Sequence, residues 1–496
     1  MKKYHDEQEQ TPFFSKLVNY SKQYIAAFDV PGHKRGNIQT DLTKKLGKNI
    51  FLYDSNAPRG LDNLNHPTGV IKKSQELASK VFHADRAYFL TGGTTLGILA
   101  MVMATVKAKE KIILPRNVHK SVINSLILSG GIPIFVKPLV DKHLQIAISI
   151  KTKNIIKTID DHPDAKAILL INPTYYGGTC DLQTIIEYAH QKGLVCLVDE
   201  AHGGNLYFHD QLPMTAMDAG ADFSAVSIHK TNLSLTQSSV LLQKGERISP
   251  NRLQATINIL QSTSPNQLFI ASLDTSRKYM YFHAKEGIDN VLELSHKYST
   301  LINEIPGISV KGRDYFQSIG CFDFDETKII IDVSKLSVNG FDIYKKLADN
   351  HSVQLELAEE QILLCVLSIA QVEKDFLYLL NALKEMSASY YKMEEFNYPP
   401  IPLNYPKRCF RPRVAYHAPF VFVDVNDSLG EICAESIMIY PPGIPLIIPG
   451  EKIDASVINS INSYIKNDLT ILSESEVGKI KVIDRANWKK PKVDNN

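Results

Sequence analysis

Seven short apolar runs between residues 86 and 242 constrain the fold of this chain more than any other feature of its sequence. They alternate with stretches of helical period, and this alternation is typical of βαβ units, which assemble into a mostly parallel sheet. The runs that we predict to be strands are 86–90, 111–114, 133–136, 167–171, 195–198, 223–228 and 239–242. The sequence therefore predicts an α/β fold around a seven-stranded, mostly parallel sheet.

Two of these runs lead into residues that suit catalysis. Asp199 follows the run at 195–198, and His229 and Lys230 follow the run at 223–228. Because the carboxyl ends of parallel strands meet at one edge of a sheet, we expect Asp199 and Lys230 to lie close together. A lysine and an aspartate in these positions fit an enzyme that holds pyridoxal phosphate (PLP) as a Schiff base, with the aspartate on the pyridinium nitrogen. A cap, a salt bridge or an exposed charge would explain either residue alone.

Three further loops lead to the same edge. The first strand runs into Gly93, Thr94 and Thr95 ahead of an apolar helix, and these backbone N–H groups and hydroxyls could hold a phosphate. An ordinary turn would explain this loop equally well, and it lacks the lysine and the glycine spacing of nucleotide-binding loops. His119 follows the second strand and could stack on a flat cofactor ring. The fourth strand leads into a polar loop at 172–178.

The chain is long enough to need more than one hydrophobic core. We expect an N-terminal arm and a large PLP-binding domain in residues 1–285, a smaller α/β domain in 286–393 and a C-terminal domain in 394–496. The prolines at 441–445 are too dense for a helix or a central strand and indicate a rigid wall. The elements predicted in the smaller domain are helices at 290–305, 342–349 and 375–392, a strand at 328–333 and a hairpin of 353–357 with 361–366.

Composition narrows the classes of partner. The chain has 55 basic and 53 acidic side chains, and its net charge of +2 gives no argument for binding nucleic acid or an anionic membrane. Six cysteines are scattered without metal-like spacing, which predicts reduced thiols and no metal site. The first ten residues lack an apolar signal segment, and the apolar run at 96–106 is too short to cross a membrane. We therefore expect a cytoplasmic protein that binds small molecules.

These motifs together resemble the Orn/Lys/Arg decarboxylase family, which consists of PLP-dependent enzymes of fold type I. The resemblance runs in order from about residue 31 to residue 451, and it is closest to the short bacterial form that includes biosynthetic arginine decarboxylases. The stretches that carry it are VPGHK (30–34), RNVHKS (116–121), NPTY (172–175), VDEAHG (198–203), SIHK (227–230), SLTQSS (234–239) and YPPGIP (440–445).

The resemblance implies that this chain decarboxylates a basic L-amino acid, with arginine as the favoured substrate and agmatine, a polyamine precursor, as the product. It also implies a homodimer or higher homo-oligomer whose subunits share active sites. Lys230 would form the Schiff base, Asp199 would bind the ring nitrogen and His119 would stack on the ring. Lys230 or His229 would return a proton to the product. The other residues implied around the cofactor are Gly93, Thr94, Thr95, Ala201, His202, Ser227, His229, Ser262 and Thr263, with the last two reaching the partner's site.

The substrate itself stays open at this point. Lysine or ornithine could replace arginine, because the segment at 231–233 departs from the family's usual residues and leaves the pocket uncertain. The distal cation of any of these substrates needs a carboxylate. Glu435 is our first candidate, followed by Glu431, Asp54 and Glu451.

Two other classes of protein share some of these features. An aminotransferase or aldolase of the same fold would also need Asp199 and Lys230, and an aminotransferase commonly holds the substrate α-carboxylate with an arginine. The arginines that could serve are Arg408, Arg411 and Arg413. A noncatalytic regulator or scaffold is the third possibility, but the presence of both Asp199 and Lys230 argues against it.

Overall fold

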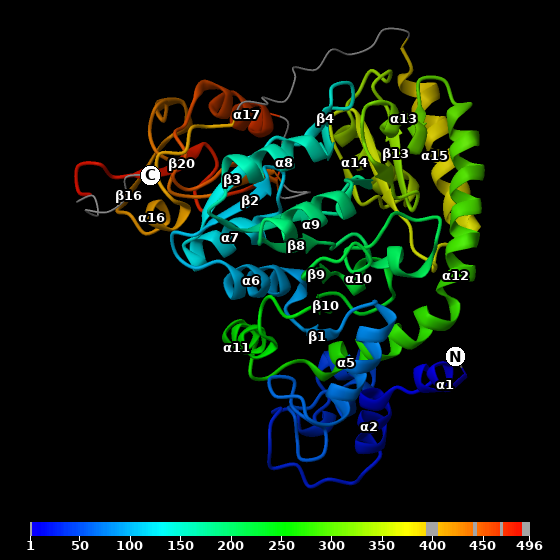
Figure 1. Cartoon of the computed structure of the whole chain (residues 1–496). Helices are drawn as coiled ribbons and strands as arrows, with labels where there is room; N and C mark the ends of the chain where they lie inside the picture. The colour runs from blue at the N-terminus through cyan, green and yellow to red at the C-terminus, as the bar shows by residue number, and fades with distance from the viewer. Residues whose placement is uncertain (1, 393–404, 440–443, 467–469, 489–496) are drawn as a thin grey trace.

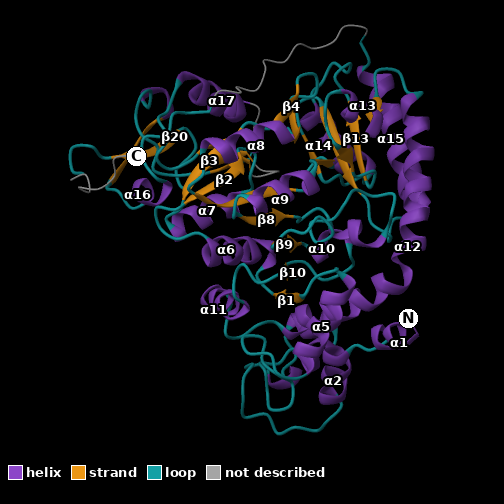
Figure 2. Ribbon diagram, viewed as in Figure 1, coloured by secondary structure: helices purple, strands orange, loops and turns teal. Residues whose placement is uncertain are grey.

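The computed structural model describes residues 2–392, 405–439, 444–466 and 470–488. A twisted sheet with helices on both faces lies at the centre of the molecule (Figure 1). The N-terminal helices project at one end, while a smaller α/β unit and a C-terminal unit flank the opposite end (Figure 2). Helix α12 crosses the boundary expected at 285, and the one expected at 393 lies outside the described residues. The domain limits therefore stay a prediction.

The central sheet contains the seven predicted strands, in the spatial order β1-β10-β9-β8-β6-β2-β3. Six of them run in one direction, whereas β10 is antiparallel to both of its neighbours, β1 and β9. The strands are β1 (Arg86–Leu90), β2 (Lys111–Pro115), β3 (Ile132–Val136), β6 (Ala165–Ile171), β8 (Val195–Asp199), β9 (Phe223–Val226) and β10 (Ser239–Gln243). The predicted sheet is confirmed. The run at 223–228 ends early as a strand because Ile228 begins a short helix, α10 (Ile228–Thr231).

Helices cover both faces of this sheet, which explains the nearly continuous apolar runs of its strands. In β8, Cys196 and Val198 belong to one hydrophobic core, whereas Leu197 belongs to the core on the opposite face. The first core includes residues of α5 (Val70–Val81), α8 (Thr152–Asp161) and α9 (Leu182–Gln191). The second includes residues of α6 (Gly93–Thr105), α7 (Lys120–Ser129) and α11 (Pro250–Leu260).

The N-terminal arm, residues 2–69, is fastened to the long helix α12 (Gln267–Asn303). The side chain of Asp274 in α12 accepts hydrogen bonds from the backbone N–H groups of Phe13 (3.0 Å) and Phe14 (3.1 Å). Arg277 donates to the backbone oxygen of Gln8 at 2.6 Å. The elements of the arm are α1 (Lys2–Gln8), α2 (Pro12–Ser21), η1 (Lys34–Gly36), α3 (Asp41–Leu46) and α4 (Asn49–Tyr53).

Helix α12 begins 23 positions before the start predicted at residue 290. The prediction failed because polar side chains such as Asp274 and Arg277 are buried in the first half of the helix, where they interrupt the apolar period. No helix in the described part of the chain, α12 included, is long and apolar enough to cross a membrane.

The smaller unit is built on an antiparallel sheet of strand order β11-β13-β15-β14. Ile329 and Ile331 of β13 pack with residues of α12, α14 and α15, whereas Ile330 packs on the other face with the β4–β5 hairpin. The strands are β4 (Leu139–Asp141), β5 (Ile146–Ser149), β11 (Ser309–Lys311), β13 (Lys328–Asp332), β14 (Leu357–Ala358) and β15 (Ile362–Val366). The helices are α13 (Arg313–Ser318), α14 (Gly340–His351) and α15 (Glu373–Tyr390). The strand and the last two helices are confirmed predictions, and the hairpin is confirmed with a first strand of Leu357–Ala358 in place of the predicted 353–357.

The C-terminal unit has its own core around Cys433, Ile447 and Val457. Part of the proline-rich stretch, residues 440–443, lies outside the described residues. Pro445 belongs to β18, an edge strand, which is where a proline can be accommodated in a sheet. The elements are α16 (Pro412–Tyr416), β16 (Phe420–Asp424), η3 (Val425–Asp427), β17 (Ile437–Ile439), β18 (Ile444–Ile447), α17 (Ala455–Lys466), β19 (Ile471–Leu472) and β20 (Lys479–Ile483).

A buried ion pair joins the C-terminal unit to the central sheet. Arg116, which directly follows β2, donates to the carboxylate of Glu451 at 2.8 Å, and both side chains are almost completely buried. Glu451 also accepts a hydrogen bond from the backbone N–H of Ile448 at 2.9 Å. The Arg116 guanidinium lies 4.9 Å from the centre of the Phe135 ring in β3. Loss of the Glu451 charge would leave the Arg116 guanidinium buried without the carboxylate that neutralises it.

We predict that Glu451→Gln destabilises the protein by about 3–5 kcal/mol, because it leaves the buried charge of Arg116 uncompensated. Urea denaturation followed by circular dichroism measures this loss. The control is Glu431→Gln, which removes an exposed pair with Arg485 and should cost less than about 1 kcal/mol. Equal losses in the two variants would contradict the structural importance of the buried pair.

Candidate active site

The carboxyl edge of the central sheet gathers most of the residues predicted for the site. Strands β2, β6, β8 and β9 are parallel, so the residues at or just beyond their ends lie along one edge. These residues are His119, Asn172, Asp199 and Ser227. Because β10 runs in the opposite direction, its first residue, Ser239, lies at the same edge.

Three hydroxyl groups meet at this edge beside the first turn of α6. The Oγ1 atom of Thr94 lies 2.5 Å from Ser227 Oγ and 3.0 Å from Ser239 Oγ. Gly93, the first residue of α6, adopts a left-handed backbone with φ of 70° that suits glycine, and Thr95 is exposed. Hydroxyls and free N–H groups at the start of a 13-residue helix form a suitable place for a phosphate.

Lys230 is held in α10 with its amine against a histidine. Its Nζ atom lies 2.6 Å from His202 Nε2. Burial lowers the pKa of Lys230 to about 8, while the charges of Asp199 and Glu356 oppose the shift and that of Lys328 adds to it. Burial and the charge of Lys230 hold the pKa of His202 well below its usual value, so His202 is neutral and its Nε2 can accept a hydrogen bond from the Lys230 ammonium. A lysine whose pKa is this low supplies free amine near neutral pH, as a nucleophile requires.

Asp199 is buried at the end of β8, and its Oδ1 atom accepts a hydrogen bond from the Ala201 backbone N–H at 3.2 Å. Burial raises the pKa of Asp199 to about 6, while the bond from Ala201 and the charge of Lys230 act in the opposite direction. A buried carboxylate with a single backbone donor retains the capacity to bind a protonated ring nitrogen. Within the described residues, His202 Nδ1 is buried without a hydrogen-bond partner. These unused groups fit PLP, which has a ring nitrogen, a carbonyl carbon for the lysine and a phosphate.

Two further histidines at the edge are held uncharged. His119 caps α7, and its Nδ1 accepts a hydrogen bond from the Ser121 backbone N–H at 3.2 Å. Desolvation by the surrounding protein, followed by the charges of Lys230 and Lys120, lowers the pKa of His119 to about 4, although part of the residue remains exposed. Burial also lowers the pKa of His229, whose Nδ1 lies 2.9 Å from the Ser238 backbone oxygen. A neutral imidazole with an exposed part suits stacking on a flat ring.

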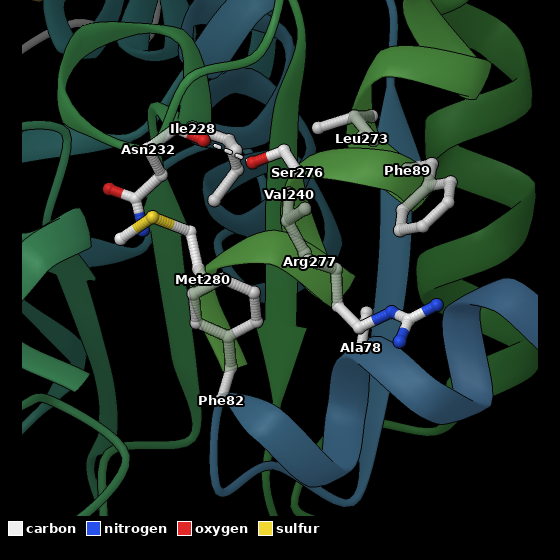
Figure 3. Close-up of a pocket in the computed structure, with 10 residues that line it drawn as sticks. All are labelled: Ala78, Phe82, Phe89, Ile228, Asn232, Val240, Leu273, Ser276, Arg277 and Met280. Atoms are coloured by element: carbon white, nitrogen blue, oxygen red, sulfur yellow. Dashed lines mark hydrogen bonds between the residues drawn. The ribbon is translucent and has the colours of Figure 1, made fainter. Parts of the chain in front are cut away.

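Asn232, which Figure 3 shows with Ser276, lies two positions after Lys230 and fixes this segment. Its Nδ2 donates to the backbone oxygen of Gly204 at 3.0 Å, and its Oδ1 accepts from the Thr231 hydroxyl at 2.6 Å. The hydroxyl of Ser276 in α12 donates to the Asn232 backbone oxygen. A Cβ atom at Gly204 would lie 2.3 Å from Asn232 Oδ1, so this approach requires glycine. Asn232 therefore ties α10 to the loop that follows His202.

The predicted substrate carboxylates are all engaged in contacts of their own. Glu435 is fully buried in the C-terminal unit, where it accepts hydrogen bonds from the backbone N–H groups of Glu474 (2.5 Å) and Lys481 (2.7 Å). Its role in substrate binding stays a prediction that these contacts do not support. The remaining candidates form the pairs Glu431–Arg485, Asp54–His33 and Glu451–Arg116.

Ser262 and Thr263 lie in an exposed loop between α11 and α12. The backbone oxygen of Ser262 accepts a hydrogen bond from Asn65 Nδ2 at 3.4 Å, which joins this loop to the N-terminal arm. No contact within the described residues connects Ser262 or Thr263 with Lys230. Their predicted role at a partner's site remains a prediction.

Sequence reasoning missed two residues beside Lys230. Tyr175 was predicted only as part of a polar loop, yet its ring centre lies 4.2 Å from that of His202 and 5.4 Å from Lys230 Nζ. Its hydroxyl donates to Glu356 of the smaller unit. Nothing in the local sequence marks Glu356, because it comes from a hairpin 181 positions further along the chain.

We predict that Lys230 in the cofactor-free protein becomes reactive toward an amine-acylating reagent with a midpoint near pH 8, as its lowered pKa requires. Quantitative peptide mass spectrometry across pH 6–10 measures the labelling. Lys157 is the control, because its hydrogen bond with Asp161 raises its pKa above the usual value. Asp199→Asn should move the Lys230 midpoint to lower pH, since it removes a stabilising negative charge. A Lys230 midpoint equal to that of Lys157 would contradict this description.

Comparisons with known proteins identify the family of this chain. Residues 11–329 match the major domain of the Orn/Lys/Arg decarboxylases and residues 392–470 match their C-terminal domain. The chain is 39% identical to the arginine decarboxylase of Halalkalibacterium halodurans, over 90% of this chain and 92% of that one. It is 37% identical to the arginine decarboxylase of Bacillus subtilis, over 92% and 93% of the two chains.

Solved structures of low sequence identity share the fold. The lysine decarboxylase of Francisella novicida aligns with a TM-score of 0.83 at 22% identity, covering 96% of this chain and 82% of that one. A serine palmitoyltransferase of Sphingomonas wittichii aligns with a TM-score of 0.53 over 77% and 85% of the two chains. These neighbours share the fold of this chain, so the predicted fold class is confirmed. The chain belongs to the Orn/Lys/Arg decarboxylase family.

Proposed function

We propose that this protein uses PLP to decarboxylate L-arginine to agmatine and CO2. The observation that carries the proposal is the meeting of Lys230, whose pKa is lowered to about 8, with the buried carboxylate of Asp199 at one edge of the sheet. Arginine is preferred over lysine and ornithine because four relatives at 36–39% identity are named arginine decarboxylases. Its placement in the cytoplasm and in polyamine biosynthesis stays a prediction.

Each residue at the edge has a role that follows from its environment. The Lys230 amine would attach the cofactor, Asp199 would accept a hydrogen bond from the ring nitrogen and His119 would pack on the ring. The residues that would surround the phosphate are Gly93, Thr94, Thr95, Ser227 and His229. When bound, PLP supplies an electron sink for the bond to the substrate's α-carboxylate. His202, which is neutral and 2.6 Å from Lys230 Nζ, can accept a hydrogen bond from the lysine and orient its amine.

We also infer that two copies of the chain associate through the N-terminal arm. Tyr24 and Phe28 in this arm are each 97% exposed. Further exposed apolar residues of the arm are Val30, Ile38, Leu42 and Leu46. An exposed apolar surface of this kind is typical of an interface, and a closed dimer is the commonest way to bury it. The arm also carries Asp54 and contacts the loop at 261–264, so a second copy seated here would lie beside Ser262.

Incubation of the PLP-loaded protein with equal amounts of arginine, lysine and ornithine tests the proposed reaction. We expect agmatine as the main amine by mass spectrometry, together with CO2, and no product from Lys230→Ala. Formation of cadaverine or putrescine would identify lysine or ornithine as the substrate, with the same decarboxylation chemistry. A keto acid in place of CO2 would indicate an aminotransferase instead.

We predict that the double variant Tyr24→Ser, Phe28→Ser weakens self-association, because it removes the two most exposed aromatic side chains of the arm. Sedimentation velocity over a range of protein concentrations measures the change as a shift from dimer to monomer. The control is Val477→Ser, which replaces an apolar residue that is 83% exposed in the C-terminal unit. A monomeric wild-type protein, or an unchanged dimer in the double variant, would reject this interface.

A further inference from the structure

Tyr175 connects the catalytic edge with the smaller unit. It lies in the loop after β6, and its ring packs against His202 with centres 4.2 Å apart. The Lys230 amine is 5.4 Å from the centre of the same ring. The hydroxyl of Tyr175 donates a hydrogen bond to Oε1 of Glu356, which immediately precedes β14. The ring and the carboxylate therefore form one continuous surface next to the lysine.

Glu356 differs from the other acids discussed above because it has no basic partner within the described residues. It is exposed, and its backbone N–H is fixed by the Leu364 oxygen at 3.1 Å. Its charge nevertheless acts on Lys230, which it stabilises in the protonated form. Lys328, a basic residue of the smaller unit whose charge acts on Lys230, is already paired with Asp325 at 2.8 Å. Glu356 is thus a negative charge available to a cation that enters the site.

The acids that the sequence predicted to bind the substrate already have partners in the structure. Glu451 is paired with Arg116, Asp54 with His33 and Glu431 with Arg485. Glu435 has its oxygens occupied by donors of its own unit. A distal cation that reached any of these carboxylates would have to displace an existing partner.

We propose that Tyr175 and Glu356 together bind the distal cation of the substrate side chain. This inference rests on the proposed function and adds to it the residues that recognise the charge. A guanidinium is planar and weakly hydrated, so it packs well on an aromatic face while it donates hydrogen bonds to a carboxylate. The Tyr175 hydroxyl occupies one position on Glu356, and a carboxylate retains further acceptor positions for the cation.

The geometry also places the two ends of the substrate correctly. The reacting carbon must lie at the lysine, and the cation of arginine is separated from it by a three-carbon chain and a nitrogen. The Tyr175 ring centre lies 5.4 Å from the Lys230 amine and its hydroxyl is bonded to Glu356, so an extended side chain can follow the ring from one to the other. An amino acid without a distal charge would leave Glu356 with the Tyr175 hydroxyl but without an ionic partner.

The test compares L-arginine with L-citrulline, which has nearly the same shape but a neutral urea group. We expect Glu356→Gln to raise the KM for arginine by about ten- to a hundredfold, the worth of a hydrogen bond to a charged group, with a smaller change in kcat. Inhibition by citrulline should be nearly unchanged, because citrulline makes no ion pair. Tyr175→Phe, which keeps the ring, should give a smaller rise in KM.

Glu360→Gln is the matched control, since it neutralises another acid of the same hairpin whose charge does not act on Lys230. Glu360→Gln should leave both the KM and the kcat for arginine unchanged. Unaltered arginine KM in Glu356→Gln would overturn the proposal, and so would an equal weakening of arginine and citrulline, which would indicate a structural role.

The failure of this proposal is distinguishable from failure of the proposed function. If the wild-type protein makes no agmatine but converts lysine, the assignment of arginine is wrong. The role of Tyr175 and Glu356 is then tested by comparing lysine with norleucine, its uncharged analogue, in the same variants. If Glu356→Gln still prefers lysine over norleucine, the proposed role of Glu356 is rejected in that case as well.

Discussion

The shared direction of six strands in the central sheet is the constraint on which the rest of the structure depends. It brings residues from separate parts of the sequence, including His119, Asp199 and Ser227, to one edge without any local signal between them. Helices cover both faces of the sheet with apolar side chains, which stabilises the strands. Polar side chains are therefore found at the edge, where the strands end. The chemistry of the site follows from this arrangement, since groups there are partly removed from water.

Burial shifts the pKa values of the basic and acidic residues at the site in opposite directions, toward each other. Burial lowers the pKa of Lys230 to about 8 and raises that of Asp199 to about 6, so each group approaches the range in which it can exchange a proton. The histidines around them are held neutral, which limits the repulsion that the lysine would otherwise meet. One environment therefore prepares an amine, a carboxylate and a set of uncharged rings for the same reaction.

The sequence was informative where burial leaves a local pattern. The seven central strands could be predicted because two-sided burial produces an apolar run in each, and Lys230 and Asp199 could be predicted because they follow such runs. The spatial order of the strands has no local signature, so the position of Ser239 beside Thr94 was missed. The extent of α12 was missed because Asp274 and Arg277 interrupt its apolar period. Glu356 was missed because a different unit supplies it, and its position depends on packing between units.

Helix α12 links three parts of the molecule that act on the site. Its first turns hold the N-terminal arm through Asp274, Ser276 supports the carbonyl of Asn232 next to Lys230, and the second half packs into the smaller unit at Val291. At 37 residues it is a stiff rod about 55 Å long. We therefore expect a tilt of the smaller unit to be transmitted along this helix to the Lys230 segment and to the N-terminal arm.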